Sequence, residues 1–284
     1  MAPKKKGTKE KGKKQGKGAK SGKQSHVLAY GDDTYWNNRY TANPVVFDWY
    51  QKYEGVKAFI NMYIPKATRV LVIGCGNSTM SEEMVHDGYI EVVNIDISSV
   101  VLEFMVTKYK GVKEMSFSRM DVREMKNLKE LTIDHVIDKG LFDSFMCGID
   151  APTNVQLMLT EVRRVMKPKG VYILVTYGDP RVRLPYLKTL EFQWEITLYV
   201  IPRPSSTKAT EPSSRIFTNP VYVCEDNTLG PQFNLDDFDW HYVYVCTKEL
   251  PTTKELPAKK GDAKGKGKEL PTKKGDAKGK VKKK

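Results

Sequence analysis

Short apolar runs alternate with segments of helical periodicity through most of the chain, and this alternation limits the possible folds more than any other feature. Three segments, 80–86, 98–109 and 155–166, place apolar residues three and four positions apart, as a helix with one buried face does. We expect Ser98 and Thr153 to cap two of these helices. Seven further runs have the length of strands: 69–74, 90–96, 115–120, 133–138, 171–176, 192–201 and 240–246.

The order of these segments predicts an α/β fold. Strands that alternate with helices form a mostly parallel, doubly wound sheet with helices on both faces, which is a Rossmann-like arrangement. No helical segment separates the last two strands, so we expect them to form an antiparallel pair at the end of a seven-strand sheet. The long loop 202–239 joins them, and a loop of this length is usually functional or mobile.

Lysine is concentrated at the two ends of the chain. Residues 1–24 contain ten Lys and one Glu, and residues 248–284 contain fourteen Lys and five acids, so each end carries about +9 of the total charge of +13. The predicted domain, residues 25–247, is therefore slightly acidic, near −5. Because the ends have few branched or aromatic residues, we expect two disordered Lys-rich tails, the second built on a repeat. Such tails either aid solubility or contact nucleic acid and other polyanions weakly.

Several classes of protein do not fit this sequence. No apolar stretch approaches the roughly 20 residues that cross a bilayer, and no apolar segment of a secretory signal follows the basic start. The cysteines at 75, 147, 224 and 246 form no C-x-x-C pair and have no histidine at a metal-ligand spacing. We therefore expect a cytoplasmic protein, or a nuclear one if the tails direct import, with no membrane contact, no disulfide and no metal site.

A strand that runs into the turn Gly74-Cys75-Gly76 and then into a helix is the first sign of a binding site. The two glycines allow the backbone to approach a ligand, and the helix offers free N–H groups at its start. A dinucleotide site would have a third glycine where this chain has Thr79. A pyrophosphate ligand is therefore disfavoured.

Two acids lie at the ends of the next two strands. Asp96 follows Gly76 by twenty residues, where a carboxylate accepts hydrogen bonds from the hydroxyls of a ribose. Asp121 ends the third strand, where an acid can accept from the amino group of an adenine. Either acid alone could instead cap the following helix. Together with the glycine turn, they predict a site for S-adenosylmethionine.

Six segments carry a more specific resemblance. They are 35–40 (Tyr-Trp-Asn-Asn-Arg-Tyr), 47–49 (Phe-Asp-Trp), 74–78 (Gly-Cys-Gly-Asn-Ser), 94–101, 120–122 (Met-Asp-Val) and 138–143 (Asp-Lys-Gly-Leu-Phe-Asp). In these segments the chain resembles the eukaryotic elongation factor 1A lysine methyltransferases. It is similar to the short member related to an endothelin-converting-enzyme fusion and to the N-terminal domain of the two-domain member. The resemblance implies a protein-lysine methyltransferase with S-adenosylmethionine as cofactor and elongation factor 1A as substrate.

The resemblance and the glycine turn together name the expected cofactor-binding residues. They are Trp36, Tyr40, Trp49, Gly74, Gly76, Asp96, Ile97, Asp121, Val122 and Lys139. Aromatic faces suit both a sulfonium and an adenine ring. The chain departs from the family at Leu141, because the family usually has Asp/Glu-Lys-Gly-Thr-Leu-Asp in this motif. That change either alters how a substrate lysine is held or repacks the turn.

Methyl transfer to a lysine requires an aligned and neutral amine. A lysine has a pKa of about 10.4, so it must lose its proton first, and burial beside a sulfonium favours the neutral form. The predicted catalytic residues are Asp138, Lys139 and Asp143, and either aspartate would orient the amine or accept its proton through water. Two alternatives stay open: a methyltransferase of RNA or small molecules, and a non-catalytic nucleoside-binding scaffold.

Overall fold

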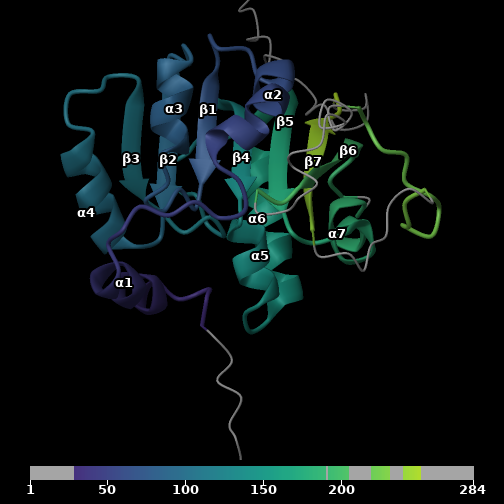
Figure 1. Cartoon of the computed structure of the whole chain (residues 1–284), viewed down its shortest axis with the longest axis horizontal. Helices are drawn as coiled ribbons and strands as arrows, with labels where there is room; N and C mark the ends of the chain where they lie inside the picture. The colour runs from purple at the N-terminus through teal and green to yellow at the C-terminus, as the bar shows by residue number, and fades with distance from the viewer. Residues whose placement is uncertain (1–28, 190, 205–218, 231–238, 251–284) are drawn as a thin grey trace, which may run out of the picture. The chain divides into compact units, whose positions relative to one another are not determined.

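The computed structural model of the chain describes residues 29–189, 191–204, 219–230 and 239–250. Their strands form one seven-stranded sheet in the order β3-β2-β1-β4-β5-β7-β6 (Figure 1). The strands are β1 (Arg69–Ile73), β2 (Glu91–Asp96), β3 (Met115–Arg119), β4 (Ile133–Lys139), β5 (Met166–Thr176), β6 (Trp194–Pro202) and β7 (Trp240–Lys248). The first five run parallel, and β7 pairs antiparallel with both β5 and β6. The predicted sheet and its terminal antiparallel pair are confirmed.

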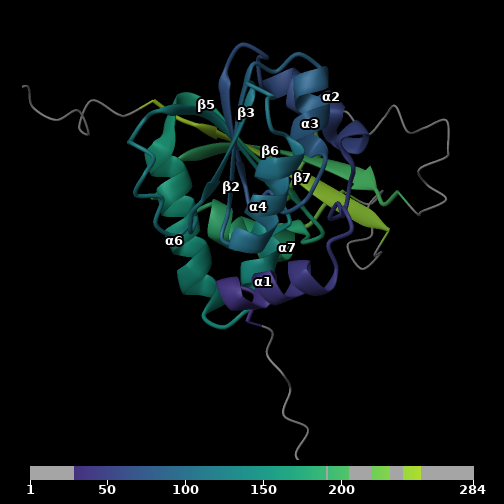
Figure 2. The same ribbon diagram turned by 90° about the vertical axis from the view of Figure 1, so that its left-hand side faces the viewer.

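Helices cover both faces of the sheet, as Figure 2 shows with the sheet seen from its β3 edge. The helices are α1 (Asp33–Ala42), α2 (Tyr53–Tyr63), α3 (Met80–His86), α4 (Ser99–Lys108), α5 (Leu141–Met146), α6 (Ala151–Val165) and α7 (Pro180–Leu187). Apolar side chains of α2, α3 and α4 pack in one core cluster, and those of α5, α6 and α7 pack in another. The apolar spacing in the sequence therefore corresponds to the buried faces of the helices.

Local features explain where several helices begin. Ser98 caps α4 as predicted, because its hydroxyl accepts a hydrogen bond from the amide of Val101 at 3.3 Å. The prediction of Thr153 as a cap is wrong. The cap of α6 is Asp150, and Thr153 lies inside the first turn. The fixed φ of Pro152 suits a first helical turn, which places the start of the helix before Thr153.

Strand β5 begins five residues earlier than the sequence predicts. Met166 pairs with Ile133, and the register then shifts so that Val171 pairs with His135. The intervening run contains Lys169 in a left-handed conformation, with φ of 65°. Proline and glycine in this run are typical of a loop, so local sequence signals end the strand too soon, whereas pairing with β4 continues it across a bulge.

Lys248 belongs to the fold and not to a tail, which corrects the predicted domain boundary by one residue. It is the last residue of β7 and is 5% exposed. Its ammonium donates to the backbone oxygens of Arg163 and Met166, both at 2.6 Å. These carbonyls lie at the end of α6, where a cation is favourable. Residues 1–28 and 251–284, together with 205–218 and 231–238 of the long loop, lie outside the described residues.

The described part of the chain has no helix that is long and apolar enough to cross a membrane. The four cysteines are free thiols in the structure. In the same ranges, no cluster of three or more His, Cys, Asp or Glu side chains has the arrangement of a metal site.

Candidate functional site

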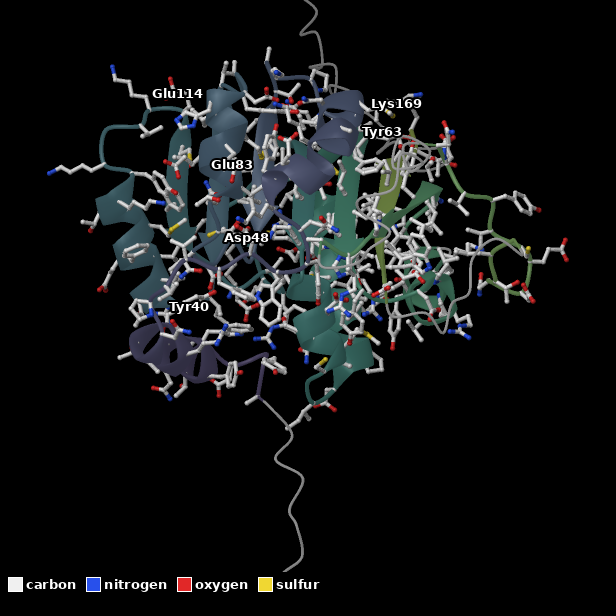
Figure 3. The ribbon with its side chains drawn as sticks, in the orientation of Figure 1. Tyr40, Asp48, Tyr63, Glu83, Glu114 and Lys169 are labelled. Carbon is white, nitrogen blue, oxygen red and sulfur yellow. The ribbon has the colours of Figure 1, made fainter. Side chains whose placement is uncertain are left out.

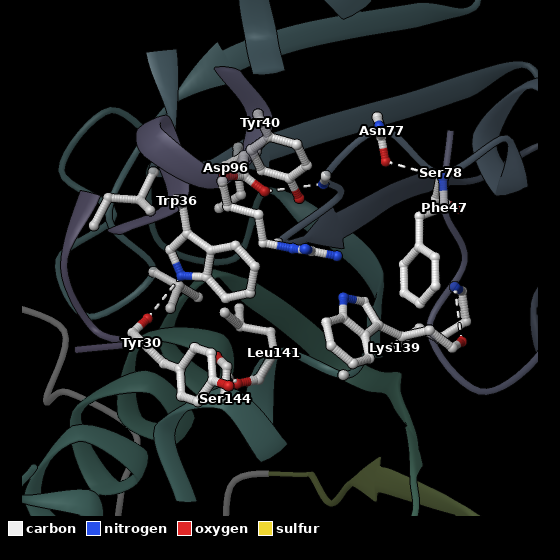
Figure 4. Close-up of a pocket in the computed structure, with 18 of the residues that line it drawn as sticks. Tyr30, Trp36, Tyr40, Phe47, Asn77, Ser78, Asp96, Lys139, Leu141 and Ser144 are labelled. Carbon is white, nitrogen blue, oxygen red and sulfur yellow. Dashed lines mark hydrogen bonds between the residues drawn. The ribbon is translucent and has the colours of Figure 1, made fainter. Parts of the chain in front are cut away.

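One pocket lies at the sheet edge where the parallel strands β1 to β4 end. All ten residues predicted to bind the cofactor line this pocket, together with Tyr30, Arg39, Phe47, Leu141 and Ser144 among others (Figure 4). Figure 3 shows Tyr40 at this edge and Glu114 and Lys169 toward the opposite edge. Ligands of open α/β sheets bind beyond the carboxyl ends of the strands, so the position is that of a binding site.

The glycine turn after β1 is packed too tightly for side chains. Gly74 and Gly76 have positive φ values of 60° and 52°. A Cβ on Gly76 would lie 2.6 Å from the hydroxyl of Tyr40, and one on Gly74 would lie 2.9 Å from the Cβ of Leu141. Both positions therefore require glycine. Leu141, the departure from the family motif, fills the space beside Gly74 and lines the pocket.

Asp96 is held in place by two backbone amides. Its Oδ2 accepts from Gly76 and its Oδ1 accepts from Ser98, each at 2.9 Å. Burial raises the pKa of Asp96, and these amide hydrogen bonds oppose that rise. A carboxylate has about four acceptor positions, so two amide bonds leave capacity for the hydroxyls of a ligand.

Asp121 is joined to a residue that the sequence reasoning missed. The guanidinium of Arg123 forms an ion pair with Asp121 at 2.6 Å and also donates to Asn154 of α6 and to the carbonyl of Gly31. Burial raises the pKa of Asp121, but the hydrogen bonds and charge of Arg123 outweigh burial and lower it. The carboxylate is therefore ionised, although part of its acceptor capacity is used. The signal for this ion pair in the sequence was that Asp121 lies two residues before an arginine.

Helix α1 brings aromatic side chains over the pocket. Trp36 and Tyr40 are one turn apart on the same face and their rings stack with centroids 6.1 Å apart. The indole of Trp36 donates to the carbonyl of Tyr30 at 2.8 Å (Figure 4). Asn37 accepts from the hydroxyl of Ser98 at 2.7 Å, and Asp33 forms an ion pair with Arg119 at 2.6 Å. The helix is thus fixed to the ends of β2 and β3.

Residues 43–52, which we call the strap, connect α1 to α2 across the pocket. Asn77 fixes its first half, because the side-chain oxygen accepts from the amide of Phe47 at 3.2 Å and the side-chain nitrogen donates to Val45 at 2.8 Å. Asp48 fixes its second half by accepting from the hydroxyl of Ser78 and from the ammonium of Lys139. The strap is therefore attached to the strand ends that form the pocket.

Lys139 lines the pocket but is engaged with the strap. Its ammonium lies 2.9 Å from Asp48 Oδ1 and 3.2 Å from the carbonyl of Trp49. The side chains of Lys139 and Asp48 are only 5% and 9% exposed. Burial lowers the pKa of Lys139, and the charge of Asp48 opposes this change. Its predicted roles in cofactor binding and catalysis stay predictions, and the contacts themselves assign it to holding the strap.

The other two predicted catalytic residues do not line the pocket. Asp138 is fully buried and accepts from the amides of Leu141 and Phe142, at the start of α5, and from the hydroxyl of Tyr172. Burial, followed by the nearby charge of Asp143, raises the pKa of Asp138 to about 7. Asp143 is 2% exposed and pairs with Arg183. The two acids of the motif at the end of β4 therefore point into the protein interior, where they support the wall of the pocket without lining it.

We expect the ion pair between Lys139 and Asp48 to control how often the strap opens. Lys139→Met leaves a buried carboxylate without its cation, and breaking a buried pair costs about 3–5 kcal/mol when the loss is global. Hydrogen exchange at the amide of Phe47 should rise at least about tenfold, which corresponds to about 1.4 kcal/mol. The double variant Lys139→Met/Asp48→Leu should recover most of the protection.

The matched control for this experiment is Lys126→Met. Lys126 forms an ion pair with Glu124 at 2.7 Å, but both side chains are largely exposed, at 74% and 65%. Exposed pairs contribute about 0–1 kcal/mol, so exchange at Phe47 should not change. Unchanged exchange in Lys139→Met as well would show that the ion pair does not hold the strap.

Comparisons with known proteins agree with this geometry. Residues 64–197 match a family described as "Methyltransferase domain". A solved structure from work on the conversion of a disulfide bond into a thioacetal group during echinomycin biosynthesis aligns with a TM-score of 0.52 and 15% identity. It covers 78% of this chain and 95% of that chain, and it supports the fold alone.

Two curated mouse proteins are more similar in sequence. "EEF1A lysine methyltransferase 4" is 29% identical over 172 residues, which cover 57% of this chain and 67% of that protein. "eEF1A lysine and N-terminal methyltransferase" is 33% identical over 157 residues, which cover 54% of this chain. The chain spans only 22% of the second relative.

The strand order, the pocket at the strand ends and the family match over residues 64–197 together support a methyltransferase domain. Within this class, the similarity to the eukaryotic elongation factor 1A lysine methyltransferases, predicted from the motifs, is confirmed by the curated relatives.

Proposed function

We propose that the protein transfers a methyl group from S-adenosylmethionine to a lysine of translation elongation factor 1A. The observation that carries this proposal is the similarity to curated relatives that are named for lysine methylation of this factor. The pocket supports the cofactor part of the proposal, because all ten residues predicted to bind the cofactor line it.

The residues of the pocket fit the cofactor. Asp96 has free acceptor capacity for ribose hydroxyls, and both glycines of the turn line the pocket beside it. Ionised Asp121 suits the adenine amino group. The faces of Trp36, Tyr40 and Trp49 suit an adenine ring and a sulfonium. When bound, the cofactor supplies an electrophilic methyl group, and the chain supplies alignment.

The acceptor side of the pocket is formed by the segment after β4. Gly140, Leu141, Ser144 and Phe145 line it there, and an amine among apolar groups loses its proton more easily. We propose that this desolvation, and not a dedicated base, produces the neutral lysine. The catalytic roles predicted for Asp138 and Asp143 would require both acids to leave buried partners.

A protein acceptor is favoured over a small molecule by the outer side of the strap. Val45, Val46, Phe47 and Trp49 are 70%, 40%, 46% and 38% exposed, although they are apolar and adjoin the pocket. Exposed apolar groups that cluster beside a site are typical of protein contact surfaces.

Radiolabelled methyl transfer tests the proposed function. The full chain and Asp96→Ala would each be incubated with labelled S-adenosylmethionine and either purified elongation factor 1A or a eukaryotic lysate. We expect wild type to label the factor on lysine, as located by mass spectrometry, and Asp96→Ala to lose the signal. Labelling of RNA or small molecules alone would keep the enzyme class and reject the lysine. Cofactor binding without any labelling would favour a scaffold role.

A further inference from the structure

The pocket contains a cation that the site described so far does not use. Arg39 lies on α1, half-buried, between the aromatic residues Trp36 and Tyr40 in sequence, and it lines the pocket. Its guanidinium carbon is 5.8 Å from the centroid of the Phe47 ring and 6.0 Å from that of Trp49. The two rings contact each other edge to face, so together they hold the guanidinium beside the strap.

The other cations near the pocket are already neutralised. Lys139 pairs with Asp48, and Arg123 pairs with Asp121. Arg39, in contrast, makes no ion pair or side-chain hydrogen bond with the residues that the structure describes, and its guanidinium lies over the two rings. A guanidinium has five N–H donors in a planar fork that matches a carboxylate. Ring contacts leave these donors without an acceptor.

The charges of the pocket therefore call for a ligand with a carboxylate. Asp96 and Asp121 suit the nucleoside part of S-adenosylmethionine, and the remaining part of that molecule is an amino acid. We propose that Arg39 binds the α-carboxylate of the methionine part of the cofactor, an inference that rests on the proposed function. Phe47 and Trp49 hold the guanidinium ready, so the strap contributes to cofactor affinity through Arg39.

A pair of ligands isolates this contact. S-adenosylhomocysteine carries the carboxylate, whereas 5′-methylthioadenosine keeps the nucleoside and the sulfur but lacks the amino acid part. Calorimetry on the full chain would measure both affinities for wild type, Arg39→Gln and Arg39→Lys. We expect Arg39→Gln to lower the affinity for S-adenosylhomocysteine by about 10- to 100-fold and that for 5′-methylthioadenosine by less than about twofold. Arg39→Lys should recover part of the loss.

Arg119→Gln is the matched control, because Arg119 also contacts α1, through Asp33, but does not line the pocket. We expect this variant to change the affinities for the two ligands by the same factor. An equal loss of both ligands in Arg39→Gln would show that Arg39 only positions α1, and would overturn the inference. Unchanged affinities with a raised KM for the protein acceptor would also overturn it, by assigning Arg39 to a carboxylate of the substrate. Wild type that binds neither ligand would instead reject the proposed cofactor itself.

Discussion

Asp96→Ala should bind S-adenosylmethionine at least about 100-fold more weakly than wild type. Hydrogen bonds to a charged group contribute about 1.5–3 kcal/mol each, and loss of two ribose contacts removes about 3 kcal/mol or more. In wild type, the amides of Gly76 and Ser98 donate hydrogen bonds to the carboxylate of Asp96, and the substitution leaves both amides without this acceptor. Calorimetric titration with S-adenosylhomocysteine would measure the loss, with thermal unfolding as the measure of folding.

Two variants separate a loss of ligand contacts from a loss of local structure. Ser98→Ala removes the cap of α4 and the contact with Asn37 but leaves the carboxylate of Asp96 in place, so we expect less than about a fivefold change. Asp121→Ala should cost less than Asp96→Ala, because Arg123 already uses part of the Asp121 carboxylate. Affinity within about threefold of wild type in Asp96→Ala would mean that the nucleoside does not bind at the end of β2.

Asp143→Asn should destabilise the fold by about 3–5 kcal/mol, because it leaves the guanidinium of Arg183 buried without its anion. The two side chains are 3% and 2% exposed and lie 2.5 Å apart. Thr176 donates to the same carboxylate oxygen at 2.5 Å. The environment of Arg183 is specific, since a Cβ on Gly178 would lie 2.1 Å from the guanidinium carbon. Denaturant unfolding would measure the change.

The double variant Asp143→Asn/Arg183→Met decides between a structural and a catalytic role. With both charges removed, most of the lost stability should return. We expect methyl transfer to return with it, because Asp143 does not line the pocket. A double variant that folds and binds the cofactor but has lost turnover would establish Asp143 as catalytic, and would contradict the role in support of the fold.

Much of the fold follows from local patterns. The strand ends could be located because apolar runs stop at residues with a clear local role, such as Gly74 and Asp96. Parallel strands then bring those ends to one edge, so residues distant in the sequence gather in one pocket. The wrong predictions also had local causes. Proline and glycine before Val171 hid the first part of β5, and Thr153 was a plausible cap, although α6 begins at Ala151 with Pro152 in its first turn.

The partners of charged residues could not be predicted in the same way. Lys139 and Asp48 are 91 residues apart in the chain, and Asp143 and Arg183 are 40 apart. Residue type shows that a charge is present, but it does not show which opposite charge forms a buried ion pair with it. The motif Asp-Lys-Gly-Leu-Phe-Asp was therefore interpreted as catalytic, whereas its two acids contact α5, Tyr172 and Arg183. Arg39 was passed over, because its exposure to the pocket depends on the strap.

The amino-acid sequence by itself determined the seven strands, the helices α3, α4 and α6, the glycine turn, the acids at the strand ends and the resemblance to a methyltransferase family, whereas α1, α2, α5 and α7 were not predicted. These properties depend on the periodicity of apolar residues and on the short spacings between motif residues, and both can be read from neighbouring positions in the chain. Only the tertiary structure decided which charges are neutralised and which face the pocket. That choice depends on long-range contacts and on burial, and both exist only when the chain is folded.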